Sequence, residues 1–386
     1  MLPTTRRPLH ILAPLAFTAL GAGLALLAAG PLNPPAGTVS PSYKTLAEVE
    51  PRIAINATNT PGDADSLFKI TAPGSYYLTG NLTGVAGKHG IEIASRGVTI
   101  DLNGFTLAGV PGMGDFDGVV VTQADIDTVT LRNGLIRGWG ATGVNFYTYL
   151  VPQCHVSNLT AEGNASNGIM VGPGSIVVGC TSRSNGATGF FSREGCTITG
   201  CSSTENGGGG ILAGSSCTLI GCTAAWNDNS GLSVGEASVV SSCSSSRNAG
   251  LGISGSAACT VTGCTSRDNA GDGILVTSNC LVSGNTVSRS GLNGIDLASG
   301  IHATGADNRI EGNNVTAGTG IGIDVDAAGN IIVRNTASGN AINWSIVANN
   351  IVGPVLDRTA PASAAINGNS APDSTGSTHP HANFTY

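Results

Sequence analysis

The sequence predicts an all-β fold, a single-stranded parallel β-helix or solenoid with about 21 residues per coil. Three series of residues with this period predict it. Small residues form the first series, at Cys154, Ser175, Cys196, Cys217, Ser238, Cys259 and Cys280. Asparagines form the second, at Asn164, Asn185, Asn206, Asn227, Asn248 and Asn269. Glycine before an apolar residue forms the third, at Gly168-Ile169, Gly189-Phe190, Gly210-Ile211, Gly231-Leu232, Gly252-Ile253, Gly273-Ile274 and Gly294-Ile295. A fixed period of this size indicates stacked repeats.

A single repeat shows why the coils are made of strands. Cys259 and Val261 alternate with Thr260 and Thr262, so the first pair is expected to face the core and the threonines solvent. The repeat has neither the leucine spacing of a leucine-rich repeat nor a helical apolar stripe. Small turn residues divide it into three short β-like pieces, which predicts three strands and three turns per coil.

The glycine and asparagine series have a structural explanation. Neighbouring strands lie ~4.8 Å apart, so equivalent residues of successive coils form columns. The apolar residues after glycine then form an inner column, and the asparagines form a ladder whose amides bond to each other and to turn backbone. Neither series is therefore assigned to chemistry.

The cysteines follow the same period. A further series runs through Cys180, Cys201, Cys222, Cys243, Cys264 and Asn285. A zinc site needs ligands that converge on one point, whereas these residues form lines along the axis. Disulfides between coils, for example Cys196 with Cys217 or Cys259 with Cys280, are sterically conceivable. Buried cysteine acting as a small apolar residue is the favoured interpretation.

The N-terminus resembles an export signal. Arg6 and Arg7 precede an apolar run over residues 11–29, followed by small residues, which predicts a signal peptide over residues 1–30. An uncleaved anchor is the alternative, and no other membrane association is expected. We expect a secreted, periplasmic or cell-surface protein. A net charge of −7 with 11% charged residues does not indicate a basic surface that would bind nucleic acid.

Composition divides the rest of the chain into three parts. Residues 31–66 are a predicted leader and cap, in which residues 43–49 form either a capping helix or part of a flexible leader. Residues 67–356 form the β-helix. Residues 357–386, rich in Pro, Ser, Ala, Asn and Gly, are a predicted disordered tail.

Gly-Asn or Gly-Cys, followed by Asn and then Gly-Ile, resembles the repeat of the right-handed parallel β-helix proteins of the pectin-lyase-like superfamily, including NosD-like members. The resemblance covers roughly residues 90–355 and departs from the commoner pattern by placing Cys at five positions where Gly-Asn is more usual. It implies a right-handed coil; the match is specific for the fold and carries little information about function. A lyase of this superfamily would need a Lys or Arg base near calcium-binding carboxylates. Lys44, Lys69 and Lys88 all precede the regular coils.

Carboxylates gather only near the C-terminal end of one predicted sheet face. The residues after each Gly-apolar pair are Met170, Phe191, Leu212, Ser233, Ser254, Leu275, Asp296 and Asp324. Asp296 is thus expected to stack near Asp324, with Asp326 two residues further along the same strand. Like charges across strands are destabilising and often mark a cation or a raised pKa. We therefore consider Ca²⁺ binding by Asp296, Asp324 and Asp326, with solvated surface carboxylates as the alternative.

A longer coil over residues 299–312 brings His302, Asp307 and Arg309 to the same end. The candidate catalytic residues are accordingly Asp296, Asp324, Asp326, His302 and Arg309.

Two further groups of charged residues lie elsewhere in the predicted solenoid. Asp115 and Asp117 lie in a loop about eight coils away, ~40 Å, and cannot share a site with Asp296. Arginines on successive coils could meet an anionic glycan, but acidic residues on the same face favour a solvated mixed surface. The arginines are Arg247, Arg267 and Arg289, and the acidic residues are Glu205 and Asp268.

The leading functional hypothesis is an exported, non-catalytic scaffold that binds extracellular or cell-envelope polysaccharide and requires no cofactor. The alternative is a carbohydrate-active enzyme, a polysaccharide lyase or glycoside hydrolase, that uses the acidic C-terminal site and Ca²⁺. The fold does not choose between them, because function depends on sites grafted onto folds.

Overall fold

The computed structural model describes residues 50–147, 151–291, 298–357 and 379–386. The chain divides into two units, Met1–Pro51 and Arg52–Tyr386. Of the first unit only Glu50 and Pro51 are described, so the expected signal peptide and the possible helix at residues 43–49 lie outside the described residues. Within the described ranges, no helix has the length and apolarity needed to cross a bilayer.

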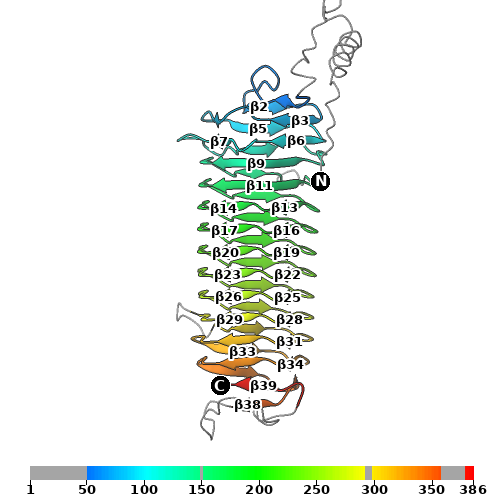
Figure 1. Ribbon diagram of the computed structural model, residues 1–386, viewed down its shortest axis with the longest axis vertical. Helices are drawn as coiled ribbons and strands as arrows, with labels where there is room; N and C mark the ends of the chain where they lie inside the picture. The colour runs from blue at the N-terminus through cyan, green and yellow to red at the C-terminus, as the bar shows by residue number, and fades with distance from the viewer. Residues whose placement is uncertain (1–49, 148–150, 292–297, 358–378) are drawn as a thin grey trace, which may run out of the picture. The chain divides into compact units, whose positions relative to one another are not determined.

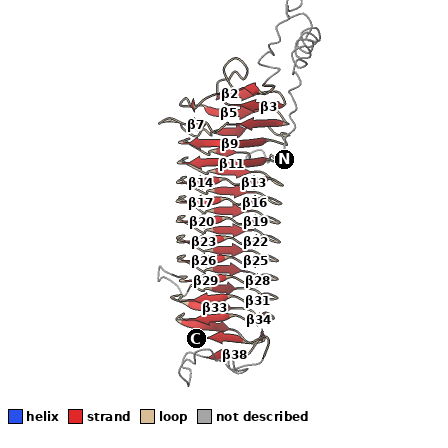
Figure 2. Ribbon diagram, viewed as in Figure 1, coloured by secondary structure: helices blue, strands red, loops and turns tan. Residues whose placement is uncertain are grey.

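The unit Arg52–Tyr386 is a stack of β coils (Figure 1), and its described residues contain strands and loops but no helix (Figure 2). A central coil has three strands, β13 (Ile176–Val178), β14 (Thr181–Arg183) and β15 (Phe190–Ser192). Each strand pairs in parallel with its equivalent in the next coil. The expected three strands per coil are therefore confirmed.

One sheet, called sheet B here, has 13 strands, one from each coil. Its strands are β2 (Ser66–Ile70), β5 (His89–Ile93), β8 (Val119–Val121), β10 (Val144–Asn145), β12 (Ile169–Val171), β15, β18 (Ile211–Ala213), β21 (Leu232–Val234), β24 (Ile253–Gly255), β27 (Ile274–Val276), β30 (Ile301–Ala303), β33 (Ile321–Val325) and β36 (Ile342–Ile346).

A second sheet, sheet A, has 26 strands, arranged in two columns that share the long strands β9 (Thr130–Arg137) and β11 (His155–Glu162). The first column contains β1 (Ile53–Ala54), β3 (Gly74–Tyr77), β6 (Val98–Asp101), β13, β16 (Thr197–Thr199), β19 (Thr218–Ile220), β22 (Val239–Ser241), β25 (Thr260–Thr262), β28 (Leu281–Ser283), β31 (Arg309–Glu311), β34 (Ile331–Val333) and β37 (Ile351–Val352). The second contains β4 (Leu82–Thr83), β7 (Thr106–Ala108), β14, β17 (Ser202–Thr204), β20 (Thr223–Ala225), β23 (Ser244–Ser246), β26 (Thr265–Arg267), β29 (Thr286–Ser288), β32 (Asn314–Thr316), β35 (Thr336–Ser338), β38 (Val355–Asp357) and β39 (Asn383–Thr385).

The asparagine ladder forms as predicted. Asn206 Nδ2 donates to Asn227 Oδ1 at 2.9 Å, and Asn185 Nδ2 donates to Asn206 Oδ1 at 3.0 Å. These amides are almost fully buried, and each also donates to a strand carbonyl of the preceding coil, as Asn206 Nδ2 does to Ser182 O of β14. The ladder thus satisfies polar groups at a corner that no water reaches.

The cysteine columns are buried and unbridged. All ten cysteines are free and lie in the core, where their thiols point at backbone carbonyls of neighbouring residues. The disulfides considered for Cys196–Cys217 and Cys259–Cys280 are absent from the structure. Burial raises the pKa of the Cys154 thiol to about 12, which keeps it protonated and unreactive.

The register changes after Ile274. The sequence pattern places the next Gly-apolar pair at Gly294-Ile295, but Ile274 pairs with Ile301, so this step is 27 residues (301 − 274) rather than 21. Residues 292–297, which include Asp296, lie outside the described residues. His302 pairs with both Leu275 and Asp324, and so holds the position in this column that the sequence pattern gave to Asp296.

The C-terminal end differs from the unordered tail expected over residues 357–386. Strand β39 pairs with β38 and β35, and Asn383 Oδ1 accepts a hydrogen bond from the backbone of Asn335 at 2.8 Å. Residues 358–378 lie outside the described residues. The returning strand adds a rung to the asparagine column at the open end of the solenoid, where it covers core that would otherwise face water.

Candidate functional site

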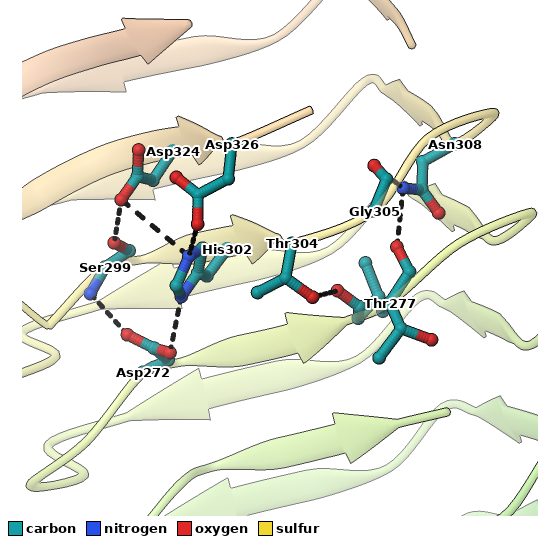
Figure 3. A network of polar contacts seen from close by, with 10 residues as sticks. Asp272, Thr277, Ser299, His302, Thr304, Gly305, Asn308, Asp324 and Asp326 are labelled. Carbon is teal, nitrogen blue, oxygen red and sulfur yellow. Dashed lines mark hydrogen bonds and ion pairs between the residues drawn. The ribbon is translucent and has the colours of Figure 1, made fainter. Parts of the chain in front are cut away.

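A polar cluster lies on the outward face of sheet B near its C-terminal end, where three successive coils meet (Figure 3). It consists of Asp272, Ser299, His302, Asp324 and Asp326, and is called the His302 cluster here. Asp272 directly precedes the Gly-apolar pair that opens β27, His302 is the central residue of β30, and Asp324 is its partner in β33. Parallel pairing therefore brings together residues that are far apart in the chain.

The imidazole of His302 lies between two carboxylates. Its Nδ1 is 3.0 Å from Asp272 Oδ2, and its Nε2 is 3.0 Å from Asp326 Oδ2. Asp324 Oδ2 lies 3.9 Å from Nε2. The hydrogen bond to Asp272, together with Asp326 and Asp324, raises the pKa of His302 to about 9 although partial burial opposes this. The side chain is therefore an imidazolium at neutral pH and donates through both nitrogens.

Ser299 joins the carboxylates of Asp272 and Asp324. Its backbone N–H donates to Asp272 Oδ1 at 2.6 Å, and its hydroxyl donates to Asp324 Oδ2 at 3.2 Å. The Asp324 side chain is 12% exposed, whereas the Asp326 side chain is 53% exposed. The cluster thus has a fixed inner edge and one carboxylate open to solvent.

The donor set can hold a metal ion. One ligand atom each from His302, Asp324 and Asp326 lies within 4.8 Å of the other two. In metal sites, the ligating histidine usually donates its second ring N–H to a carboxylate, which fixes its orientation. Asp272 is placed for that role on Nδ1. To bind a metal ion through Nε2, His302 would first have to lose the proton on that nitrogen.

Not all predicted site residues meet here. His302, Asp324 and Asp326 come together, whereas Asp296 lies outside the described residues. Arg309 lies in sheet A, where its Nη2 is 2.7 Å from Glu311 Oε2, and Asp307 is an exposed turn residue. These two residues are close to His302 in sequence, but a strand and a turn direct them away from sheet B.

Two members of the cluster, Asp272 and Ser299, were not among the predicted site residues. They occupy the column directly before the Gly-apolar pairs, where Asp272 follows Leu251 and precedes Ser299. The column after these pairs supplied the predicted acidic residues. Asp272 can be found from sequence by reading the column before the pairs as well as the column after them. Ser299 cannot, because its place beside Asp272 depends on Gly300-Ile301 being the next pair of the stack.

A second polar group lies at the N-terminal end of sheet B. Asp117 accepts hydrogen bonds from the Thr142 backbone at 2.8 Å and from Asn145 Nδ2 at 3.0 Å, and burial raises the pKa of Asp117. His89 Nδ1 accepts the Asp117 backbone N–H at 2.9 Å. Eight strand steps separate β8 from β30 in sheet B, ~40 Å, so the two groups are separate sites, as predicted for Asp117.

Parallel strands in stacked coils, the amide ladder and the outward cluster together define a β-helix repeat protein. A family model described as "Right handed beta helix region" matches residues 75–223 and 211–354, which is more than half of the chain. The chain therefore belongs to the right-handed β-helix family.

Several solved structures are similar to this chain. The A-module of the Azotobacter vinelandii mannuronan C-5 epimerase AlgE4 has a TM-score of 0.46 and 14% identity, over 73% of this chain and 91% of that one. The pectate lyase Pel9A has a TM-score of 0.40 and 14% identity, over 74% and 77%. The periplasmic alginate epimerase AlgG has a TM-score of 0.41 and 12% identity, over 77% and 78%. No curated protein matches the sequence.

Proposed function

We propose that this protein is an exported polysaccharide-binding β-helix in which the His302 cluster takes a divalent cation that links the protein to a carboxylated glycan. One observation carries the proposal: ligand atoms of His302, Asp324 and Asp326 lie within 4.8 Å of one another on the outward face of a continuous parallel sheet. Such a face presents equivalent positions at regular steps of ~4.8 Å, which suits a polymer of repeating units.

Charge supports a role for a cation. The cluster has three carboxylates and one imidazolium, an excess of two negative charges, and the whole chain carries −7. A carboxylated glycan would be repelled by such a surface. A divalent cation bound by the cluster offsets most of this negative charge, since three carboxylates, a neutral imidazole and the ion sum to −1, and it offers open coordination positions to a sugar carboxylate.

The ligand types favour a transition metal over Ca²⁺. Calcium takes six to eight oxygen ligands, whereas an imidazole nitrogen with two carboxylates suits Zn²⁺ or a similar ion. The Ca²⁺ prediction depended on Asp296, and His302 holds the stacked position expected for that residue. We therefore propose Zn²⁺ or a chemically similar divalent ion, bound through His302 Nε2 with Asp272 on Nδ1.

A second candidate function is catalysis on the same polysaccharide class, as a lyase or hydrolase. The 3.0 Å contact between Asp272 and His302 favours it, since a carboxylate that orients an imidazole is a frequent arrangement in acid–base catalysis. In that case the raised pKa makes His302 a proton donor, with Asp324 or Asp326 as the base. The basic and apolar N-terminus supports export to the periplasm, cell surface or medium under either function.

Isothermal titration with Zn²⁺ near pH 7.5 tests the proposal on the wild type, Asp324→Asn and the control Asp307→Asn. Asp307 is an exposed turn residue outside the cluster. We expect Asp324→Asn to lose Zn²⁺ binding and Zn²⁺-dependent retention on a polyuronate column, and Asp307→Asn to keep both. A wild type that binds neither overturns the proposal. Unsaturated or new reducing ends that vanish in Asp324→Asn would establish catalysis instead.

A further inference from the structure

A surface groove lies along the turn between sheets A and B, on a different part of the coil from the outward face of sheet B. It has a volume of about 450 Å³ and is lined by Trp226, Arg247, Asp268, Asp228, Ala249 and Ala270, with buried ladder asparagines beneath. We propose that this groove binds a carboxylated sugar of an anionic polysaccharide directly, without a cation.

The side chains on one wall are not needed for the turn itself. Trp226, Arg247, Asp268 and Arg289 occupy one column, one residue before the asparagine ladder or its continuation, and all have φ between 51° and 58°. A left-handed conformation costs a residue with a Cβ about 1 kcal/mol or more. Gly339, one residue after β35, holds a positive φ with no such cost. Ser184, Glu205 and Ala317 hold the same conformation in this column, so the turn forms with small as well as large side chains and does not itself require Trp226 or the arginines.

Trp226 offers an exposed aromatic surface. Its side chain is 56% exposed, and the Arg247 guanidinium lies over the ring at 4.9 Å from the centroid. This cation–π contact fixes the orientation of the indole. The axial C–H groups of a sugar ring pack well on an exposed aromatic surface, because both are apolar and flat.

Arginines beside the tryptophan surround a single carboxylate. Arg289 binds Asp268 through two nitrogens, and Arg267 Nε and Arg247 Nε lie 3.1 and 3.9 Å from Asp268 Oδ2. The hydrogen bonds from Arg289 lower the pKa of Asp268, which stays ionised. Three guanidinium groups and one carboxylate leave two positive charges at this place on an otherwise acidic protein, and Asp228 at the groove offsets one of them.

The geometry suits an anionic polymer. Each of the three arginine side chains is nearly half exposed, so their remaining N–H groups are open to a ligand. A guanidinium matches a carboxylate with two parallel hydrogen bonds. The arginines come from coils ~4.8 Å apart, a step comparable with the length of one hexopyranose ring. A uronate unit can thus pack on Trp226 while its neighbour's carboxylate meets Arg267 or Arg289.

Part of this inference rests on the proposed function, namely the choice of a polysaccharide as the ligand. The groove itself does not depend on the His302 cluster. The two can therefore fail separately, and measurements in the presence of a chelator isolate the groove.

Affinity for polygalacturonate oligosaccharides, measured in EDTA by titration calorimetry, tests the inference. The variants are Trp226→Ser and Arg267→Ser, with Arg183→Ser as the matched control. Serine already occurs in the column of Trp226, at Ser184, and in the column of Arg267 and Arg183, at Ser246. The fold should therefore tolerate all three serine variants. Arg183 holds the position equivalent to Arg267 but pairs with Glu162 away from the groove.

We expect each groove variant to weaken binding at least tenfold and Arg183→Ser to change it less than twofold. Neutral dextran should not bind. Equal binding of wild type and groove variants, binding of dextran as tight as that of polygalacturonate, or no binding by the wild type would each overturn the inference. Asp324→Asn should lose Zn²⁺-dependent retention on the column but keep the wild-type affinity measured in EDTA, because the His302 cluster is not part of the groove.

Discussion

The Nδ1 atom of His302 lies 3.0 Å from Oδ2 of Asp272, although 30 residues separate the two in the chain. One coil separates them in space, because the coil between them is 27 residues long instead of 21. The extra length thus places an imidazole where the regular pattern expected a carboxylate. This contact determines the charge state of the cluster, and the first prediction follows from it.

The stability of the protein should depend on His302 at alkaline pH. The folded-state pKa of about 9 lies above the ordinary value of 6.5, so the imidazolium stabilises the folded protein. That contribution is complete below about pH 6.5 and is lost as the pH rises through about 9. Its upper limit is about 3 kcal/mol, reduced by solvent screening around Asp326.

We therefore expect the melting temperature of the wild type to fall between pH 6.5 and 9.5 more than that of His302→Gln. The exposed His155→Gln serves as the control and should follow the wild type. An NMR titration of the His302 ring should show a midpoint near 9. A midpoint at or below 6.5 would contradict the described contacts.

Removal of one rung from the asparagine ladder should be strongly destabilising. In Asn206→Ala the backbone N–H of Asn185 loses its acceptor, and Asn227 Oδ1 loses a donor. Buried groups without partners cost about 1–3 kcal/mol each, so we expect a loss of about 2–4 kcal/mol in urea unfolding. Asn229→Ala, at an exposed turn position, should cost less than about 1 kcal/mol. Equal effects of the two variants would argue against a buried ladder.

The cysteine column should accept asparagine at one end. Cys264 donates its backbone N–H to Asn285 Oδ1 at 2.8 Å, and Asn285 begins a column of asparagines that continues at Asn313. Cys264→Asn extends this column by one rung, so its free energy of unfolding should stay within about 1 kcal/mol of the wild type. Cys264→Leu overfills the same position and should lose about 1–3 kcal/mol. A larger loss for asparagine than for leucine would refute this account.

The thiols should be protected in the folded protein. All ten cysteines are buried and free, and a buried thiol reacts slowly because a reagent in solution cannot reach its sulfur. We expect almost no reaction with a thiol reagent under native conditions and ten thiols per chain after unfolding in denaturant without reductant. A count below ten would reveal disulfides that the structure does not contain.

The repeated part of the fold could be predicted from sequence because each coil contains the residues that specify its own turns and strands. Glycine marks tight corners, asparagine marks the ladder, and alternation in a unit such as Cys259 to Thr262 marks which side chains face inward. These signals are local and recur at a constant step, so neighbouring coils confirm one another. The free, buried state of the cysteines followed from the same regularity.

The candidate site could be predicted only in part. Asp324 and Asp326 follow a Gly-apolar pair that is correctly aligned, and both belong to the cluster. Asp296 follows Gly294-Ile295, which matches the pattern as well as Gly300-Ile301 does. Only pairing with the preceding coil decides between two such matches, since Ile301 rather than Ile295 lies beside Ile274.

The sequence alone thus determined the coil, its period, its core columns and the end of sheet B where acidic residues gather. Tertiary structure decided which residues meet there: it placed His302 between Asp272 and Asp326, directed Arg309 to sheet A, and gathered three arginines around Asp268. The physical reason is that strand register is a relation between coils. Where an insertion interrupts a constant period, the local sequence no longer specifies which residues become neighbours.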